Sequence, residues 1–184
     1  MKLYISYGSN LNKRVMRQRC PGARPVGKFM LTKAKLVFRG VADVEYSPND
    51  SVPCGLWLID KQNEAALDRY EGVSSGSYYK EESIVLKYKG KPHNALVYLM
   101  SNEGIYPPSE FYVETIRKGY KDFGLDESYL DAAIQQSFTH KAPNESTRSR
   151  RGRQREDARH RRLVEMPEEV AMKVVALKQS NAGQ

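Results

Sequence analysis

The order of apolar runs along the chain limits the possible fold more than any other feature of the sequence. Runs with the lengths and bounding residues of β-strands prevail up to about residue 100, and helical spacing prevails afterwards. The expected strands cover Lys2 to Tyr7, Gly27 to Phe38, Val41 to Tyr46, Val52 to Ile59, Tyr78 to Tyr88 and His93 to Met100. A doubly wound parallel sheet would alternate strands and helices throughout. The observed order therefore predicts an α+β fold, with a curved or closed sheet and helices outside it.

Turn-forming segments separate some of these runs. Pro48-Asn49-Asp50 has the composition of a turn between two strands. Lys89-Gly90-Lys91-Pro92 has the character of a hairpin turn. We therefore expect the strands on either side of each segment to be distinct.

Capping residues mark the expected helices. Ser9 or Asn10 can cap a short helix that runs through Val15. Asp60 stands at the N-cap of a helix over Lys61 to Glu71, and Gly72 follows its end. The later helices begin after Pro107-Pro108-Ser109, with an end near Gly119, and after Asp126, with an apolar stripe of Leu130, Ala133, Ile134 and Phe138.

The composition is that of a folded protein with one core. The 184 residues suffice for one domain of ordinary size and an appendage. A hydrophobic fraction of 40% and 12 Tyr are more than a disordered chain would contain. No apolar stretch has the length of a signal-peptide core or a membrane span, so we expect a cytoplasmic protein.

The cysteines and histidines do not suggest a metal site. Cys20 and Cys54 are far apart and belong to no CxxC pattern, so two reduced, partly buried thiols are expected. The three histidines lack the spacing of a zinc-binding helix. We predict no metal and no cofactor.

The charge divides the chain into a domain over residues 1–142 and a basic, largely disordered tail over residues 143–184. The stretch from Ser146 to Arg162 holds eight Arg against Glu156 and Asp157. Within the tail, Pro167 to Lys178 has the pattern of a short amphipathic helix. The tail is either a solvated linker or a segment that contacts RNA, DNA or an anionic membrane face. Contact with nucleic acid would be without sequence specificity, because the Arg-rich stretch lacks aromatic residues for base stacking.

A strand, a glycine and a helix start meet at Tyr7-Gly8-Ser9-Asn10-Leu11. Consecutive backbone N–H groups can converge at such a place and bind a carboxylate, a phosphate or an oxyanion. Taken alone, however, a segment of this length is more often an ordinary capped turn.

Glu71 is expected at the C-terminal end of its helix. The negative end of the helix dipole disfavours a charged carboxylate there and raises its pKa, which suits a general base. An acidic residue before a capping glycine is nevertheless often only a solvated helix end.

Three motifs together resemble the γ-glutamylcyclotransferase family, which includes γ-glutamylamine cyclotransferases and AIG2-like proteins. Tyr7-Gly8-Ser9-Asn10-Leu11 matches the signature that follows the family's first strand. Glu71-Gly72-Val73-Ser74-Ser75-Gly76-Ser77-Tyr78 matches the segment of its catalytic glutamate. Pro107-Pro108-Ser109 followed by Tyr112 matches its third element. The resemblance covers roughly three quarters of the chain and implies a small mixed β-barrel flanked by helices.

The resemblance also implies a reaction and a site. The substrate would be a γ-glutamyl amino acid or γ-glutamyl amine, which an intramolecular aminolysis converts to 5-oxoproline and a free amine. Glu71 would be the base. The implied substrate-binding residues are Tyr4, Ile5, Ser6, Tyr7, Gly8, Ser9, Asn10 and Tyr112. The alternative is a non-catalytic module that binds a γ-glutamyl or other carboxylate ligand and carries an anion-binding tail.

Overall fold

The computed structural model of the chain describes residues 1–139 and 172–173. Its strands are β1 Lys2–Ser6, β2 Arg24–Phe38, β3 Ala42–Ile59, β4 Tyr78–Tyr88, β5 Lys91–Met100 and β6 Met172–Lys173. Its helices are the 3-10 helix η1 Ser9–Leu11 and the α-helices α1 Lys13–Arg19, α2 Lys61–Glu71, α3 Glu110–Phe123 and α4 Ser128–Thr139.

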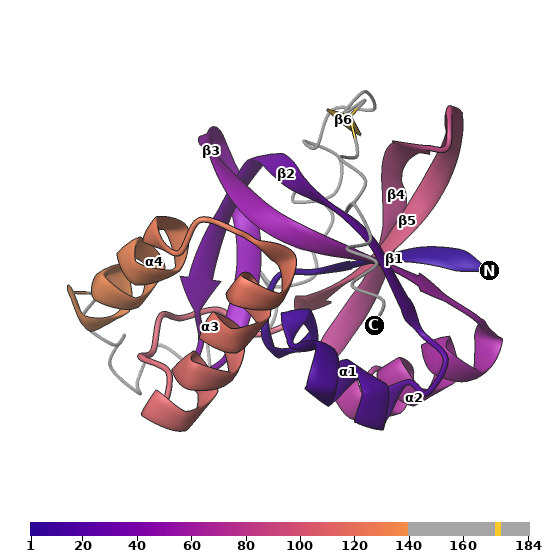
Figure 1. Ribbon diagram of the computed structural model, residues 1–184. Coiled ribbons are helices and arrows are strands. Elements are labelled where there is room, and N and C mark those ends of the chain that lie inside the picture. The colour runs from indigo at the N-terminus through magenta and orange to yellow at the C-terminus, as the bar shows by residue number, and fades with distance from the viewer. Residues whose placement is uncertain (140–171, 174–184) are drawn as a thin grey trace, which may run out of the picture.

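The strands form one mixed sheet in the order β2-β3-β1-β5-β4-β6. Strand β1 lies near the middle, antiparallel to β3 and parallel to β5. Figure 1 shows that β2 and β3 bend strongly and that the helices lie outside the sheet. This arrangement confirms the predicted α+β fold with a curved sheet and external helices.

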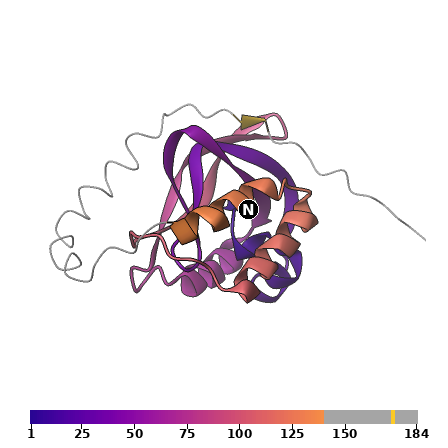
Figure 2. The same ribbon diagram turned by 90° about the vertical axis from the view of Figure 1, so that its left-hand side faces the viewer.

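The helices cover the sheet in two pairs. Helices α1 and α2 lie side by side, whereas α3 packs on η1 and α4 packs on β2 (Figures 1 and 2). The interior between them and the sheet is apolar, and its largest fully buried side chains include Trp57, Tyr120, Phe38 and Phe123. Both cysteines are free, and they are fully buried where partly buried thiols were expected.

Strands β2 and β3 form one long hairpin, so the predicted turn at Pro48-Asn49-Asp50 is wrong. Their pairing runs from Phe38 opposite Ala42 to Arg24 opposite Leu58. The register shifts where Thr32 pairs with Ser51 and Ala34 pairs with Tyr46, which leaves the turn-like residues in a bulge. A bulge accommodates residues that disfavour regular pairing without ending the strand. The two predicted strands, Val41 to Tyr46 and Val52 to Ile59, are therefore parts of one strand, β3, which begins at Ala42.

The helix starts were predicted with mixed success. Asp60 caps α2 through a capping box with Asn63, and Gly72 ends it with a φ of 66°, as expected. Helix α1, however, begins after Asn12, whose side chain accepts from two backbone N–H groups of the first turn. The predicted cap at Ser9 or Asn10 is wrong because these residues form η1, a separate 3-10 turn.

Two other expectations have opposite outcomes. The hairpin between β4 and β5 is confirmed, since Tyr88 pairs with Lys91 and the intervening Lys89 and Gly90 both have positive φ.

The apolar stripe predicted for α4 is wrong at its last residue. Phe138 is 68% exposed, whereas the neighbouring Ser137 is buried. The last turn of α4 thus does not present Phe138 to the core.

Helix α3 lies directly on the loop that follows β1. A Cβ atom at Gly119 would stand 2.5 Å from the Cβ of Leu11 and 2.6 Å from the backbone nitrogen of Asn12. No side chain separates the two elements at this point. Tyr112 lies two turns earlier, on the same face of α3.

Of the predicted tail, the structure describes only Met172 and Lys173. They form β6, which pairs in parallel with Leu86 and Lys87 of β4. The Arg-rich stretch, the rest of the predicted helix over Pro167 to Lys178 and the expected polyanion contact lie outside the described residues.

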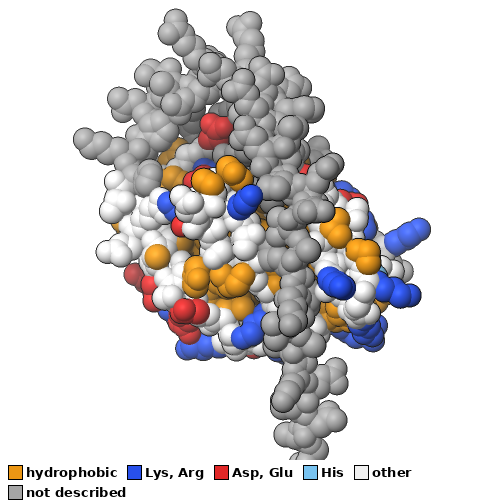
Figure 3. Space-filling view, turned by 90° about the horizontal axis from the view of Figure 1, so that it is seen from above, with side chains coloured by type: hydrophobic (Ala, Val, Ile, Leu, Met, Phe, Trp, Pro, Cys, Tyr) orange, Lys and Arg blue, Asp and Glu red, His pale blue; other side chains and the backbone are white. Residues whose placement is uncertain are grey.

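The described surface mixes charged and hydrophobic side chains. On the face seen in Figure 3, Lys and Arg side chains are most numerous toward the right-hand edge but also stand beside the acidic ones at the lower left, and hydrophobic side chains lie in patches among them. Across residues 1–139 and 172–173, no helix is long and apolar enough to cross a membrane.

Candidate active site

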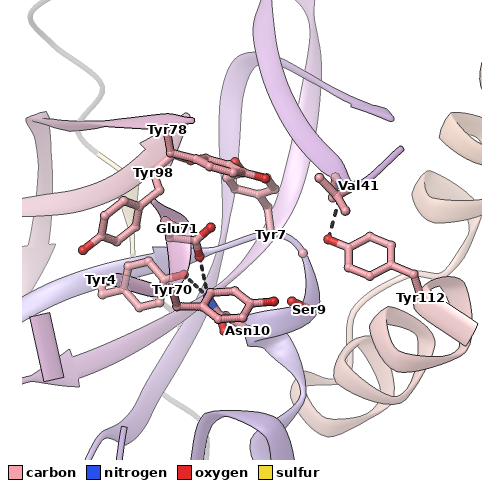
Figure 4. Close-up of a pocket in the computed structure, with 12 residues that line it drawn as sticks. Tyr4, Tyr7, Ser9, Asn10, Val41, Tyr70, Glu71, Tyr78, Tyr98 and Tyr112 are labelled. Carbon is pink, nitrogen blue, oxygen red and sulfur yellow. Dashed lines mark hydrogen bonds between the residues drawn. The ribbon is translucent and has the colours of Figure 1, made fainter. Parts of the chain in front are cut away.

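A cavity of about 260 Å³ opens where the three sequence motifs meet. Figure 4 shows side chains entering it from β1, the following loop, the end of α2, the paired strands β4 and β5, and α3. Its lining consists of Tyr4, Tyr7, Gly8, Ser9, Asn10, Val41, Ala42, Tyr70, Glu71, Tyr78, Tyr98 and Tyr112.

Most of the residues that the resemblance implies lie at this cavity. Glu71, Tyr112 and the segment from Tyr7 to Asn10 all line it, together with Tyr4. Ile5 and Ser6 do not line it. Ile5 is fully buried in the core, and the hydroxyl of Ser6 donates to the carbonyl of Gly55 and accepts from the indole of Trp57.

Glu71 is a carboxylate that few groups stabilise. Its Oε1 accepts a hydrogen bond of 3.1 Å from the Asn10 side-chain nitrogen. Burial raises its pKa to about 7, although the nearby Arg19 cation and the Asn10 hydrogen bond lower it. The direction agrees with the sequence-based expectation, but burial, not the helix end, is the largest cause. A carboxylate with this pKa can both accept and return a proton near neutral pH.

Asn10 connects Glu71 to two other groups. Its Nδ2 atom also donates to the Tyr4 hydroxyl at 2.8 Å, and its Oδ1 atom accepts from Arg19 at 2.6 Å. The side-chain amide is therefore hydrogen-bonded on both sides. Figure 4 shows the contacts of its nitrogen with Glu71 and Tyr4. This connection joins the loop after β1 to the end of α2.

Tyrosine side chains form most of the cavity wall. The Tyr7 hydroxyl donates to the backbone oxygen of Tyr98 at 2.6 Å, and the Tyr98 hydroxyl donates to Asp68 at 2.7 Å. Burial raises the pKa of both tyrosines, so both remain neutral at physiological pH. The wall thus offers apolar rings and neutral hydroxyls rather than fixed charges.

Tyr112 approaches the loop at Gly8. Its hydroxyl accepts from the backbone N–H of Ala42 at 3.2 Å. A Cβ atom at Gly8 would stand 3.2 Å from both the Tyr112 hydroxyl and the Ala42 Cβ. Glycine at this position therefore lets α3 and the β2–β3 hairpin close around the loop.

The sequence reasoning did not place five lining residues and one neighbour in the site. Tyr70 and Tyr78 flank the Glu71 motif, so their proximity to it was a usable signal. Tyr98 reaches the cavity through the pairing of β5 with β1, and Val41 and Ala42 lie at the turn between β2 and β3, whose place beside Tyr112 no local pattern indicates. Arg19 lies at the end of α1, where the predicted helix had already ended at Val15.

The described part of the chain contains no group of His, Cys, Asp and Glu side chains that could hold a metal ion. Glu71 is the one acidic side chain among the residues that line the cavity, and that lining contains no Lys, Arg or His. The chemistry that these residues can supply is proton transfer by a carboxylate and hydrogen bonding by hydroxyl, amide and backbone groups.

Comparison with known proteins places the chain in a family. An AIG2-like family model matches residues 51–132, which contain Glu71 and Tyr112. Gamma-glutamylcyclotransferase from Homo sapiens is 35% identical over 141 residues, which are 70% of this chain and 75% of that protein. The chain belongs to the γ-glutamylcyclotransferase family. It is an enzyme of that type.

Other members of the family support the assignment. Gamma-glutamylcyclotransferase from Mus musculus is 33% identical over 141 residues, again 70% of this chain and 75% of that protein. A solved structure of a gamma-glutamyl cyclotransferase superposes with a TM-score of 0.62 at 29% identity, and the match covers 78% of this chain and 89% of that one. The family's fold and the fold described above therefore agree.

Proposed function

We propose that this cyclotransferase converts a γ-glutamyl amino acid or γ-glutamyl amine into 5-oxoproline and a free amine. One observation carries the proposal: Glu71, whose pKa is raised to about 7, lies in the cavity that the three motifs build. Glu71 is the base in this reaction.

The α-amine of the γ-glutamyl group is the nucleophile. It is largely protonated at neutral pH, so it first transfers a proton to the Glu71 carboxylate. The free amine nitrogen then attacks the γ-carbonyl carbon of the same molecule and forms a tetrahedral intermediate. Glu71 returns this proton to the departing nitrogen as the bond between the γ-carbon and that nitrogen breaks. The attacking nitrogen loses a second proton as it becomes the ring amide, and Glu71 passes this proton to the amine, which leaves as an ammonium ion. Two protons thus move from the attacking nitrogen to the leaving nitrogen, and no water is consumed.

The loop after β1 holds the polar groups of the substrate. Because the lining contains no Lys, Arg or His, the α-carboxylate requires neutral donors, and the backbone N–H groups of Gly8, Ser9 and Asn10 serve this purpose or hold the oxyanion of the intermediate. Preorganised donors of this kind contribute on the order of 3 kcal/mol each to transition-state stabilisation. Tyr4 and Tyr7 flank the loop, and Tyr112 positions the glutamyl chain from α3.

The enzyme's main task is to fold the substrate. Nucleophile and electrophile belong to one molecule, so holding them in a near-attack conformation supplies much of the rate enhancement. The tyrosine rings around Glu71 restrict the glutamyl chain, and Glu71 moves the proton.

The test is mass-spectrometric detection of 5-oxoproline from a panel of γ-glutamyl amino acids and γ-glutamyl amines. We expect release by the wild type and by Glu114→Gln, an exposed Glu on α3, but not by Glu71→Gln. Circular dichroism checks that all three are folded. Turnover by folded Glu71→Gln would contradict the role of Glu71. If the folded wild type released no 5-oxoproline from any substrate of the panel, the result would favour a module that binds carboxylate ligands without catalysis.

A further inference from the structure

Arg19 contacts the candidate site from behind the cavity wall. Its guanidinium lies 3.5 Å from the centre of the Tyr70 ring, and its Nη2 donates to the Tyr70 hydroxyl. Its Nη1 donates to the hydroxyl of Ser9 at 3.0 Å and to Oδ1 of Asn10 at 2.6 Å. One side chain at the end of α1 thus holds the loop after β1 and the end of α2 together.

The contact with Arg19 fixes the orientation of the Asn10 amide. The oxygen of the amide faces the guanidinium, so its nitrogen faces Glu71 and Tyr4. In the reversed orientation, the amide oxygen would face the carboxylate and the NH₂ group would face a cation. Both contacts would then be repulsive.

The amide in turn distinguishes the two oxygens of Glu71. Oε1 accepts from Asn10, whereas the second carboxylate oxygen points away from Asn10, on the side of Tyr7 (Figure 4). When Glu71 takes a proton, its negative charge disappears and no longer holds the amide in place. Arg19 keeps its charge, so it can maintain the orientation through the whole cycle.

We propose that Arg19 is a positioning residue, which holds the Asn10 amide so that Oε1 of Glu71 stays hydrogen-bonded and the other oxygen exchanges the proton with the substrate. This role rests on the proposed function. It also identifies Arg19, Asn10 and Glu71 as one unit, built from α1, the loop after β1 and α2. Arg19 acts on the reaction through Asn10 and does not itself touch the reacting atoms.

The other titratable groups near Glu71 do not replace this cation. Tyr70 lines the cavity beside Glu71 but can carry no positive charge. The other groups that interact electrostatically with Glu71 are Tyr4, Tyr7, Cys20, Tyr78 and Tyr112. All of them are neutral at physiological pH, and burial raises the pKa of each. Removing the charge at Arg19 should therefore change the titration of Glu71, which a merely structural role would not do.

The first experiment compares Arg19→Met with Arg17→Met. Arg17 lies in the same last turn of α1 but is exposed, so it controls for the loss of a cation near the helix end. We expect Arg19→Met to lower kcat on the order of 10- to 100-fold, the effect of a slightly misplaced catalytic group, and to move the acid limb of the kcat profile to higher pH. Arg17→Met should change neither. Equal kcat and pH profiles for the two variants would overturn the proposal.

A double-mutant cycle tests whether Arg19 acts through Asn10. In an Asn10→Ala background, Arg19→Met should cost less than threefold in kcat, because the amide that it positions is gone. Additive losses would overturn the proposal. If Arg19→Met does not fold, Arg19→Lys replaces it in the kinetic comparison. Lysine keeps the charge but cannot bridge Asn10 and Tyr70, so we expect a lower kcat and an unchanged acid limb of the kcat profile.

An NMR titration of the Glu71 carboxyl carbon separates this inference from the proposed function. It needs no turnover, and it should give a higher pKa in Arg19→Met than in the wild type. If the wild type shows no cyclotransferase activity but the pKa still moves, the proposed reaction fails and the contact between Arg19 and the Glu71 unit stands. An unmoved pKa would contradict the inference whether or not the enzyme turns over.

Discussion

Two carboxylates with restricted access to solvent, Asp43 and Glu71, have opposite surroundings. Asp43 is fully buried, and its oxygens accept from the Arg39 side chain at 2.8 Å and from the backbone nitrogen of Met100 at 3.0 Å. Glu71 accepts a longer hydrogen bond of 3.1 Å from Asn10, and it faces a cavity.

This difference distinguishes a carboxylate with a structural role, Asp43, from a carboxylate that can exchange a proton with a substrate, Glu71. Asp43 and Arg39 tie the β2–β3 hairpin to β5, and a substrate has no access to either oxygen. The burial of Glu71 is compensated less well, so its protonated and charged forms are nearly equal in free energy near neutral pH. A buried carboxylate is therefore a candidate base when its partners are few and weak, and a structural residue when they saturate it.

The largest effect is expected from Glu71→Gln, on activity. Loss of a positioned base should lower kcat on the order of 1000-fold. Steady-state assays of 5-oxoproline release would measure it, and the midpoint of thermal unfolding should remain that of a folded protein. A fall of less than tenfold in kcat would mean that another group takes the proton. The comparison with Asp43 would then not distinguish a catalytic carboxylate from a structural one.

Arg39→Met should have the next largest effect, on stability. It leaves the Asp43 carboxylate buried without its cation, which should lower the free energy of unfolding by about 3 kcal/mol. Urea denaturation would measure the change. Arg39 pairs with Glu45 as well as with Asp43. The matched control is Arg117→Met, because Arg117 also pairs with two carboxylates, Glu127 and Asp131, but at the surface. That variant should lose less than about 1 kcal/mol. Equal losses would show that burial of the Arg39 pair is irrelevant.

A pH titration of stability sharpens the comparison further. Because the pKa of Glu71 is raised in the folded state to about 7, the folded protein binds this proton more tightly than the unfolded chain does. The stability of the wild type should therefore fall, relative to Glu71→Gln, as the pH rises from about 4.5 to about 7, with a total on the order of 2 kcal/mol after allowance for partial exposure. Urea denaturation of both proteins at pH 5 and pH 8 tests this. The raised pKa would be contradicted if the difference in free energy of unfolding between the wild type and Glu71→Gln were the same at pH 5 and pH 8, or if it shifted in favour of the wild type at pH 8.

The smallest effect concerns two tyrosines of α3. Tyr112→Phe removes a hydroxyl that lines the cavity and accepts from Ala42, so we expect kcat/KM to fall roughly tenfold, about the value of one hydrogen bond. Tyr120→Phe removes a buried hydroxyl that has no hydrogen-bond partner in the described part of the chain, and it should leave kcat/KM unchanged. Equal kinetics for the two variants would remove Tyr112 from the proposed site.

Local signals in the sequence were sufficient for part of this molecule. Helix α2 was predicted with its correct ends because a capping aspartate and a left-handed glycine determine both of them. The position of Glu71 follows directly from that helix. The turn at Pro48 was wrongly predicted because local composition does not distinguish a turn from a bulge in a paired strand. Pairing with β2 decides that case.

The candidate site was less accessible from the sequence, for a physical reason. The motifs indicated Tyr7 to Asn10 and Glu71, but a motif does not say which side chains turn toward a cavity. Ile5 and Ser6 are next to the loop and point elsewhere, whereas Tyr98 is distant in sequence and lines the wall. Such positions depend on the pairing of β1 with β5, which no short window of sequence contains.

The close contact at Gly119 determines the width of the cavity from a distance. Any side chain there would push α3 off Leu11, and Tyr112 would move with the helix, because both residues lie on one face of it. The distance between the Tyr112 wall and the loop after β1 is therefore set by a residue that touches neither substrate nor base. Over evolutionary time, a single codon change at this position would be a route by which a relative could come to admit bulkier substrates while its catalytic residues stayed unaltered.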